Sequence, residues 1–550
     1  MRKYLCLFFT FIAVNIFSLP DQKIIYPDEW AYHALTALAL EQNILFFSGS
    51  PLTVLRFKSM LSEIDESRLS PEGQILYHKL HEYFLSQAFL SFEMGAMNFS
   101  IDPLLQPEFY FKTNRYLDYA YNNYYRKSFI PISVSFSFSP YFNAQFEGNI
   151  EQGLPLVYDH DNHANFPGYS LNIPHRAYVS FGLPLPKSSG LQFRIGIGEE
   201  FIGRTYLGSV ILSDRMKDVF YAAFSAYNPV FEYGARILQL DVNKYFYLHT
   251  MEARFFRRIY FTFVEGVLVN APLELRFLNP LMVFHSLGAW EDYKNYLGEK
   301  TDMENKFGED NIDRRDMRVA SFFAMKLELQ LFRYTRFYAI WALNELETRQ
   351  EKTEETESLR PNAFALQAGL EVAIPFSGAL LTFGIEGVYT YPFVYVSRDK
   401  LWSFYKSTYG NADSFRYWTG SPFGPDSIAG TFWAGYEKSF WSIKGDFLFL
   451  TQGERASLSI FDSPDYHPVL MDSYEAAKLR TPTGVPSYTY QVRISGTWRP
   501  KNWIRLSLHP SYRIVMNHNN IENNLRHGFE ITLSTQFIPR NLWNFNFVWK

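Results

Sequence analysis

The sequence predicts a mainly β protein, a large antiparallel transmembrane β-barrel of about eighteen strands with a small N-terminal α-helical region. Residues 362–374 and 488–498 alternate apolar and polar side chains over about ten residues, the period of a strand and a length that suits a tilted membrane crossing. Between residues 318 and 537, short turns alternate with long polar connections, as in outer-membrane barrels. Aromatic residues form 19% of the chain, enough for two interfacial girdles.

Composition narrows the class of protein further. The 52 Lys and Arg residues nearly balance the 56 Asp and Glu residues, so a nucleic-acid partner is not expected. After the N-terminus, no apolar run approaches the length of a membrane-spanning helix. This combination argues against an inner-membrane protein.

Residues 1–18 resemble a secretory signal peptide. Arg2 and Lys3 precede an apolar run over residues 4–17, and Ser18 is a small residue suited to cleavage. Cys6, the only cysteine, lies inside this segment, so the mature chain is expected to have no disulfide.

Residues 19–105 are predicted to form a periplasmic α-helical region. Within residues 27–92, apolar side chains recur at helical spacing in three short segments. Ser50-Pro51 and Ser70-Pro71 each place a capping hydroxyl before a proline at the first helical position. Such helices bury their apolar stripes against each other or against the barrel. The sequence leaves open whether they are a simple folding cap or a plug or docking surface.

Residues 106–550 are predicted to form the barrel, with strands that begin near Phe109. The polar run at residues 158–163 contains groups able to ligate a cation, but a solvated loop is favoured because spacing alone does not establish convergent geometry. No metal or cofactor is therefore expected. Residues 287–316 are rich in Asp and Glu and are expected to be a solvated acidic loop.

A resemblance to a known family lies between residues 198 and 286. Its elements are Glu-Glu-Phe-Ile-Gly-Arg at 199–204, Gly-Ser-Val-Ile-Leu-Ser-Asp at 208–214, Tyr-Leu-His at 247–249, Glu-Ala-Arg at 252–254, Val-Glu at 264–265 and Glu-Leu-Arg-Phe-Leu-Asn-Pro at 274–280. This order resembles the capsule assembly Wzi-like family of outer-membrane proteins. The resemblance implies a lectin-like barrel, with a helical N-terminal region, that holds exported polysaccharide at the cell surface.

Glu265 falls on the same alternating face as Phe261, Phe263 and Val267. A carboxylate facing lipid is disfavoured, so the pattern predicts a β-bulge that turns Glu265 into the lumen. The expected lumenal charged network then comprises Arg254, Glu265, Arg276 and Arg336.

The connection at residues 397–428 combines aromatic rings with charged side chains. Sugars present apolar C–H faces ringed by hydroxyls, so a sugar site needs flat rings beside hydrogen-bonding groups. The alternative is that these rings pack into the barrel mouth as a plug, and the two roles are compatible. The candidate carbohydrate-binding residues are Trp402, Tyr405, Tyr409, Arg416, Tyr417 and Trp418.

The last ten residues conflict with the loop pattern. Trp543, Phe545, Phe547 and Trp549 alternate as in a terminal barrel strand. The sequence of short and long connections, however, makes residues 529–537 the last strand of the wall. The final segment is expected either to cap the barrel or to add a pairing segment.

The functional expectation is a non-enzymatic outer-membrane protein that binds surface polysaccharide, with a porin-like diffusion channel as the alternative. The chain has no Gly-x-Ser-x-Gly, His-Glu-x-x-His or phosphate-binding glycine loop, and no catalytic residue is assigned. The expected partners are cell-surface polysaccharide, outer-membrane lipid and the barrel-assembly machinery. The helices are expected in the periplasm and the long loops outside the cell.

Overall fold

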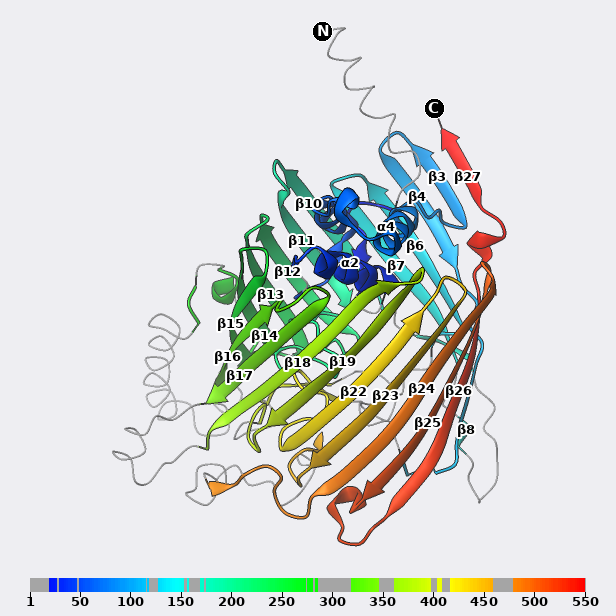
Figure 1. Ribbon diagram of the computed structural model, residues 1–550. Coiled ribbons are helices and arrows are strands. Elements are labelled where there is room, and N and C mark those ends of the chain that lie inside the picture. Colours follow the sequence, from blue (N-terminus) through cyan, green and yellow to red (C-terminus); the bar gives the residue numbers. More distant parts are fainter. Residues whose placement is uncertain are drawn as a thin grey trace.

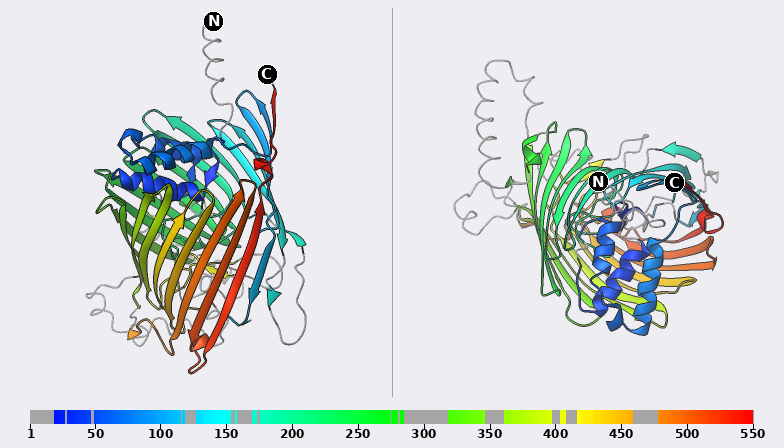
Figure 2. Two further views of the ribbon diagram at one scale, coloured as in Figure 1. Left: turned by 45° about the vertical axis from the view of Figure 1, so that its right-hand side comes forward. Right: turned by 90° about the horizontal axis from the view of Figure 1, so that it is seen from above.

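The computed structural model describes residues 19–26, 29–46, 49–114, 116–117, 127–152, 156–157, 169–172, 175–273, 275–279, 282–284, 318–345, 361–396, 403–407, 416–458 and 478–549. Within these ranges, one sheet of 23 strands curls into a tall barrel, and three α-helices lie across one of its mouths (Figures 1 and 2). The predicted fold class is confirmed. The expected signal peptide and the polar loops at 158–163 and 287–316 lie outside the described residues.

The wall consists of long strands in which apolar side chains alternate with lumenal polar ones. These strands are β6 (Ile130–Phe138), β7 (Phe142–Gln152), β10 (Ala177–Leu185), β11 (Ser189–Gly198), β12 (Val219–Tyr227), β13 (Phe231–Asp241), β14 (Lys244–Phe255), β15 (Ile259–Asn270), β16 (Arg318–Leu329), β17 (Thr335–Glu345), β18 (Ala363–Phe376), β19 (Ala379–Thr390), β22 (Ser427–Glu437), β23 (Trp441–Gln452), β24 (Ser487–Lys501), β25 (Ile504–Met516) and β26 (Arg526–Phe537). From β10 to β26 each wall strand pairs antiparallel with the next wall strand along the chain. The segment through β4 (Met97–Pro103) and β5 (Glu108–Lys112) forms one more wall strand. Among the described residues the wall therefore has eighteen strands, as predicted. Strands begin earlier than expected, at β3 (Leu90–Met94).

The ring closes at the first wall strand, the segment through β4 and β5, which we call the seam. No single continuous ladder of backbone hydrogen bonds crosses it in the described residues, because β4 and β5 pair with different neighbours. β4 pairs with β6, whereas β5 pairs with β26. Between them, the N–H groups of Leu104 and Gln106 donate to carbonyls at the start of β6, at 3.0 and 2.7 Å. Leu105 and Phe537 exchange two backbone hydrogen bonds of 3.2 and 2.8 Å. Three residues thus hold the two ends of the wall together.

The helices α2 (Trp30–Glu41), α3 (Val54–Leu61) and α4 (Pro71–Phe84) form a cap with its own apolar core. The predicted start of α4 is confirmed, because Ser70 Oγ accepts the N–H of Gly73 at 3.1 Å. The predicted cap at Ser50 is wrong: α3 begins after Thr53. Residues 52–53 (β2) pair with β1 (Ile24–Ile25) and are therefore extended. Among the described residues, no helix has the length and apolarity that crossing a membrane requires.

The cap binds the end of the barrel that carries the short turns. The N–H of Leu45 donates to the carbonyl of Arg257 between β14 and β15 at 2.7 Å. The N–H of Tyr334, between β16 and β17, donates to Leu40 at 3.1 Å. The strand ends that the long connections join lie at the opposite end of the wall, which we call the long-loop end.

The C-terminal segment is neither a wall strand nor a cap. β27 (Phe545–Trp549) pairs in parallel with β3 and extends the sheet beyond the ring (Figure 1). β26 is the last strand of the wall, as the loop pattern predicted.

Candidate functional site

Residues 199–218, which join β11 to β12, enter the lumen and cross it as a strut. The stacked rings of Tyr206 and Trp433 on β22, 4.2 Å apart, mark its arrival at the far wall. Gly203 and Gly208 adopt φ values of +88° and +98°, which favour glycine. A Cβ on Gly208 would also lie 2.6 Å from the hydroxyl of Ser213. The Gly-Arg and Gly-Ser elements of the sequence resemblance therefore have a structural role in turning the strut.

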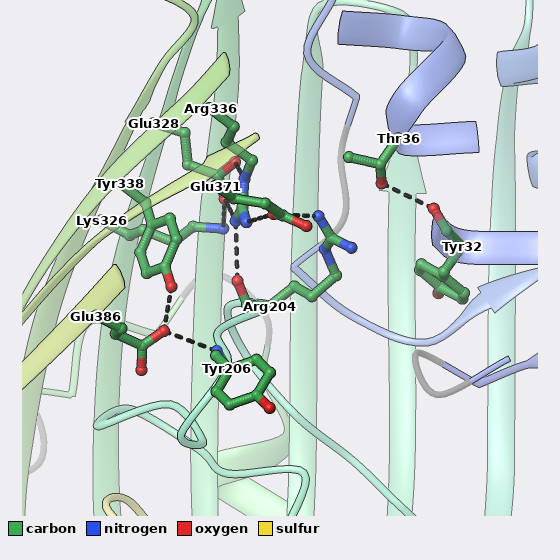
Figure 3. A network of polar contacts seen from close by, with 10 residues as sticks. All are labelled: Tyr32, Thr36, Arg204, Tyr206, Lys326, Glu328, Arg336, Tyr338, Glu371 and Glu386. Atoms are coloured by element: carbon green, nitrogen blue, oxygen red, sulfur yellow. Dashed lines mark hydrogen bonds and ion pairs between the residues drawn. The ribbon is translucent and has the colours of Figure 1, made fainter. Parts of the chain in front are cut away.

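Glu386 of β19 anchors the strut. Its carboxylate accepts the backbone N–H of Tyr206 at 2.7 Å and the hydroxyl of Tyr338 (Figure 3). It also accepts the backbone N–H of Leu207 at 3.0 Å and the side-chain amide of Gln367 at 2.7 Å. Only 1% of Glu386 is exposed. A buried carboxylate is tolerated where several donors satisfy it, so these contacts fix the strut to the wall.

A buried ion network lies beside this anchor. Arg336 donates to Glu328 at 2.7 Å, to Glu371 at 3.0 Å and to the carbonyl of Arg204 at 2.9 Å (Figure 3). Arg204 itself donates to Glu371 at 2.8 Å. Lys326 donates to Glu328 at 2.8 Å. The network joins three wall strands to the strut. The expected pairing of Arg336 with Glu265 is wrong, because Arg336 pairs with Glu328 and Glu371 instead.

The cap joins the same charged interior. Arg56 of α3 and Glu232 of β13 form a bidentate pair, with one N–O distance of 2.8 Å, and both side chains are 3% exposed. The N–H of Gly203 in the strut donates to the carbonyl of Gly49 in the cap at 3.1 Å. Strut, cap and wall are thus linked through one set of buried polar contacts.

The predicted contacts of Arg254 and Glu265 in the charged network are also wrong. Arg254 pairs with Glu63 of the cap at 2.9 Å, not with Glu265. The bulge predicted at Glu265 is wrong, because β15 keeps continuous register with β14 and β16 there. Val264 points into the lumen, and neighbouring residues of a strand point to opposite faces. Glu265 therefore lies on the outer face. The side chain of Arg276 lies outside the described residues.

A folded-back segment explains how Glu265 is tolerated on the outer face. Residues 275–279 and 282–284, after β15, lie over β14 and β15, where Phe284 stacks on His249 at 4.2 Å and Phe277 contacts Tyr247 at 5.1 Å. Only 8% of Glu265 is exposed. Protein, instead of a bulge, separates this carboxylate from the lipid-facing surface.

A cavity of about 1070 Å³ lies on the long-loop side of the strut; we call it the recess. Its walls combine aromatic rings with arginines, amides and hydroxyls, which is the chemistry of a sugar site. The residues that line it include Arg215, Arg416, Tyr417, Trp418, Phe423, Gln452, Glu454, Ser487, Thr489, Arg513, Asn519 and Asn520.

The predicted carbohydrate-binding residues divide into two groups. Arg416, Tyr417 and Trp418 line the recess, with Trp418 held by an indole N–H bond to the carbonyl of Ala456 at 3.1 Å. Tyr405 is buried in the core behind them, under the Nζ atom of Lys244 at 3.6 Å from its ring centre. Trp402 and Tyr409 lie outside the described residues. The described rings pack into the barrel mouth, as the plug interpretation of this loop expected, and two of them also face the recess.

The far wall of the recess is not predicted by the sequence. Arg215 belongs to the strut, and Arg513 and Asn520 belong to β25 and the turn that follows it. The alternation of β25 places Arg513 on the polar, lumenal face. This signal was available, but nothing local in the chain pairs it with Trp418.

The comparisons with known proteins bear on the fold. No family model and no curated protein sequence matches the chain. Among solved structures, Wzi of Escherichia coli, described as an outer-membrane protein involved in group 1 capsule assembly and a carbohydrate-binding β-barrel, aligns over 93% of this chain and 98% of its own, with 10% identity and a TM-score of 0.55.

Two other outer-membrane proteins align less well. OprD of Pseudomonas aeruginosa covers 82% of this chain and 96% of its own at 8% identity and a TM-score of 0.38. The DcaP channel of Acinetobacter baumannii covers 81% and 98% at 6% identity and a TM-score of 0.35. The chain therefore has the fold of an outer-membrane β-barrel and resembles Wzi over nearly its whole length. The alignments with OprD and DcaP carry no functional argument.

Proposed function

We propose that this outer-membrane barrel binds exported surface polysaccharide in the recess and does so without catalysis. The observation that carries the proposal is the composition of the recess, in which Tyr417 and Trp418 lie beside Arg416 and Arg513 in one cavity. Aromatic rings stack on the C–H faces of sugars, while guanidinium and amide groups hydrogen-bond to hydroxyls and carboxylates. The fold shared with a carbohydrate-binding barrel supports the same proposal.

The orientation follows from the proposed function. A polysaccharide on the cell surface must reach the recess from outside, so the long-loop end faces the exterior and the cap faces the periplasm. This arrangement agrees with outer-membrane barrels, in which short turns are periplasmic. A protein of the outer membrane must be exported from the cytoplasm, so we infer that residues 1–18 direct this export.

The filled lumen disfavours the channel alternative. Leu207, Val210 and Ile211 of the strut are fully buried within the barrel, and the cap occupies the short-turn mouth. A diffusion pore requires a water-filled lumen instead. We therefore infer that the lumen supports the recess from below and does not conduct solutes.

The test compares glycan binding by the refolded protein and by a Trp418→Ala variant. Loss of one stacking ring is expected to lower the affinity for surface polysaccharide from the same cells about five-fold, since a ring contributes on the order of 1 kcal/mol. Trp498→Ala, on the exposed outer face of β24, is the matched control and should leave binding unchanged. Equal binding by the Trp418→Ala variant and the control would refute the proposed site, provided that heat-modifiable gel mobility shows both barrels folded.

A further inference from the structure

β27 and β3 extend the sheet from β4 of the wall beyond the ring at the short-turn end. We call β27, β3 and β4 together the lip, and it has two chemically different faces. One face is polar and turns toward the cap. Ser91 donates to Asn546 at 2.6 Å, and Asn546 donates in turn to Gln87 at 2.7 Å. A small cavity lined by Lys23, Glu93 and other polar residues separates this face from the start of the chain.

The opposite face of the lip is aromatic and exposed. Phe547 of β27 stacks on Phe92 of β3 at 5.0 Å, and Phe92 contacts Phe99 of β4 at 6.3 Å. Phe547 is 53% exposed and Phe92 is 45% exposed. Water-exposed rings in such a row are unusual on a soluble surface, where large apolar patches mark an interaction site.

This row continues without a break onto the outer wall of the barrel. In register, Phe99 faces Phe136 of β6. Phe136 contacts Phe142 of β7 at 6.0 Å, and Phe142 contacts Phe181 of β10 at 5.0 Å. Phe181 is 47% exposed on the lipid-facing side of the ring.

We propose that the aromatic face of the lip lies in the membrane interface at the short-turn end, so that Phe92 and Phe547 contact lipid as the outer wall does. Aromatic belts occupy this level in outer-membrane barrels, where rings meet both headgroups and acyl chains. The polar face then points toward the cap and away from lipid. The C-terminal strand is thereby a membrane anchor outside the ring. This inference is independent of glycan binding.

The experiment places a polarity-sensitive thiol probe at single cysteines of the full-length protein refolded into phosphatidylethanolamine and phosphatidylglycerol vesicles. Phe547→Cys and Phe92→Cys test the aromatic face in a Cys6→Ser background. Phe181→Cys on the outer wall is the lipid reference. Ser100→Cys, on the polar face of β4, and Asn546→Cys, next to the test position in β27, are the matched controls.

The expected result is a blue-shifted emission at positions 547 and 92 that equals the shift at 181. Nitroxide-labelled lipid should quench these probes, whereas iodide should quench those at 100 and 546. Iodide quenching at 547 and 92 as strong as at 546 would overturn the proposal and leave the face open to a protein partner. Heat-modifiable mobility of each labelled variant shows that its ring has formed, so a changed probe signal reports the lip alone.

Discussion

The helix-bearing half of the lumen and its long-loop half are filled in different ways. Near the cap, buried ion pairs such as Arg56–Glu232 and Arg336–Glu328 join every element to its neighbours. At the long-loop end, rings such as Trp418 and Phe423 line a cavity of about 1070 Å³. Substitution of one member of a buried ion pair is costly, because the other charge loses its partner. A cavity, in contrast, is lined by side chains that leave space beside them. On the proposed function, this difference separates a structural seal from a binding surface.

The largest expected effect is at the seal. Glu232→Ala removes the carboxylate that holds the buried Arg56 guanidinium by two hydrogen bonds, and this should lower the free energy of unfolding by about 3–5 kcal/mol. Urea unfolding in lipid vesicles, with proteolysis of the helices as a second measure, would detect the loss. The double variant Arg56→Met with Glu232→Leu should recover most of the stability, because an apolar pair can replace a buried ion pair. Unchanged stability of the Glu232→Ala variant would show that the Arg56–Glu232 pair does not hold the cap to the wall.

A second substitution tests the strut. Glu386→Ala removes the acceptor of two backbone N–H groups, and each buried donor without a partner costs about 1–3 kcal/mol. The strut should loosen, so steady ion conductance is expected in planar bilayers, where the native chain should show little. Glu437→Gln, a wall carboxylate paired with Arg499 away from the strut, is the control. A closed Glu386→Ala barrel would show that the cap alone blocks the lumen.

A milder change at the long-loop end sharpens the contrast. Trp418→Phe keeps an aromatic ring but removes the indole N–H that donates to Ala456, so the expected loss of stability is about 1 kcal/mol or less. Conductance should stay at the native level. A loss as large as that of Glu232→Ala would mean that both ends are equally intolerant of change.

The smallest effect concerns acidity at the cap. Burial, with the positive charges of Arg204 and Lys444, lowers the pKa of His33 in α2 to about 4, while Glu371 acts in the opposite direction. Between that value and the usual pKa near 6.5, the unfolded chain binds more protons than the folded one. Stability of the cap is therefore complete above about pH 6.5 and falls as pH drops toward 4.

His33→Gln supplies the control for this pH dependence. Urea unfolding at pH 7 and pH 5 should show a smaller difference for the variant than for the native protein. Equal differences would assign the acid sensitivity to other groups.

Local pattern predicted much of the fold and little of the lumen. The two-residue period of residues 362–374 marks β18 because one face of that strand meets lipid and the other meets polar contacts. The strut has no such period, and its anchor joins Tyr206 to Glu386, 180 residues further along the chain. Contacts of that range depend on how the wall curves, which no short window encodes. The cover over Glu265 was missed for the same reason, since Phe277 and Phe284 pack back onto the strands that precede them.

The seam has a consequence for the biogenesis of the protein. Each hairpin from β10 onward can form between neighbours in the chain, but the ring needs residues 104–112 to meet β26, more than 400 residues later. Until β26 has been exported, the sheet keeps two unpaired edges, and such edges invite pairing with other chains. Closure of the ring is therefore the last step of assembly. A chain truncated before residue 526 cannot form a closed barrel, even if all its other hairpins have formed.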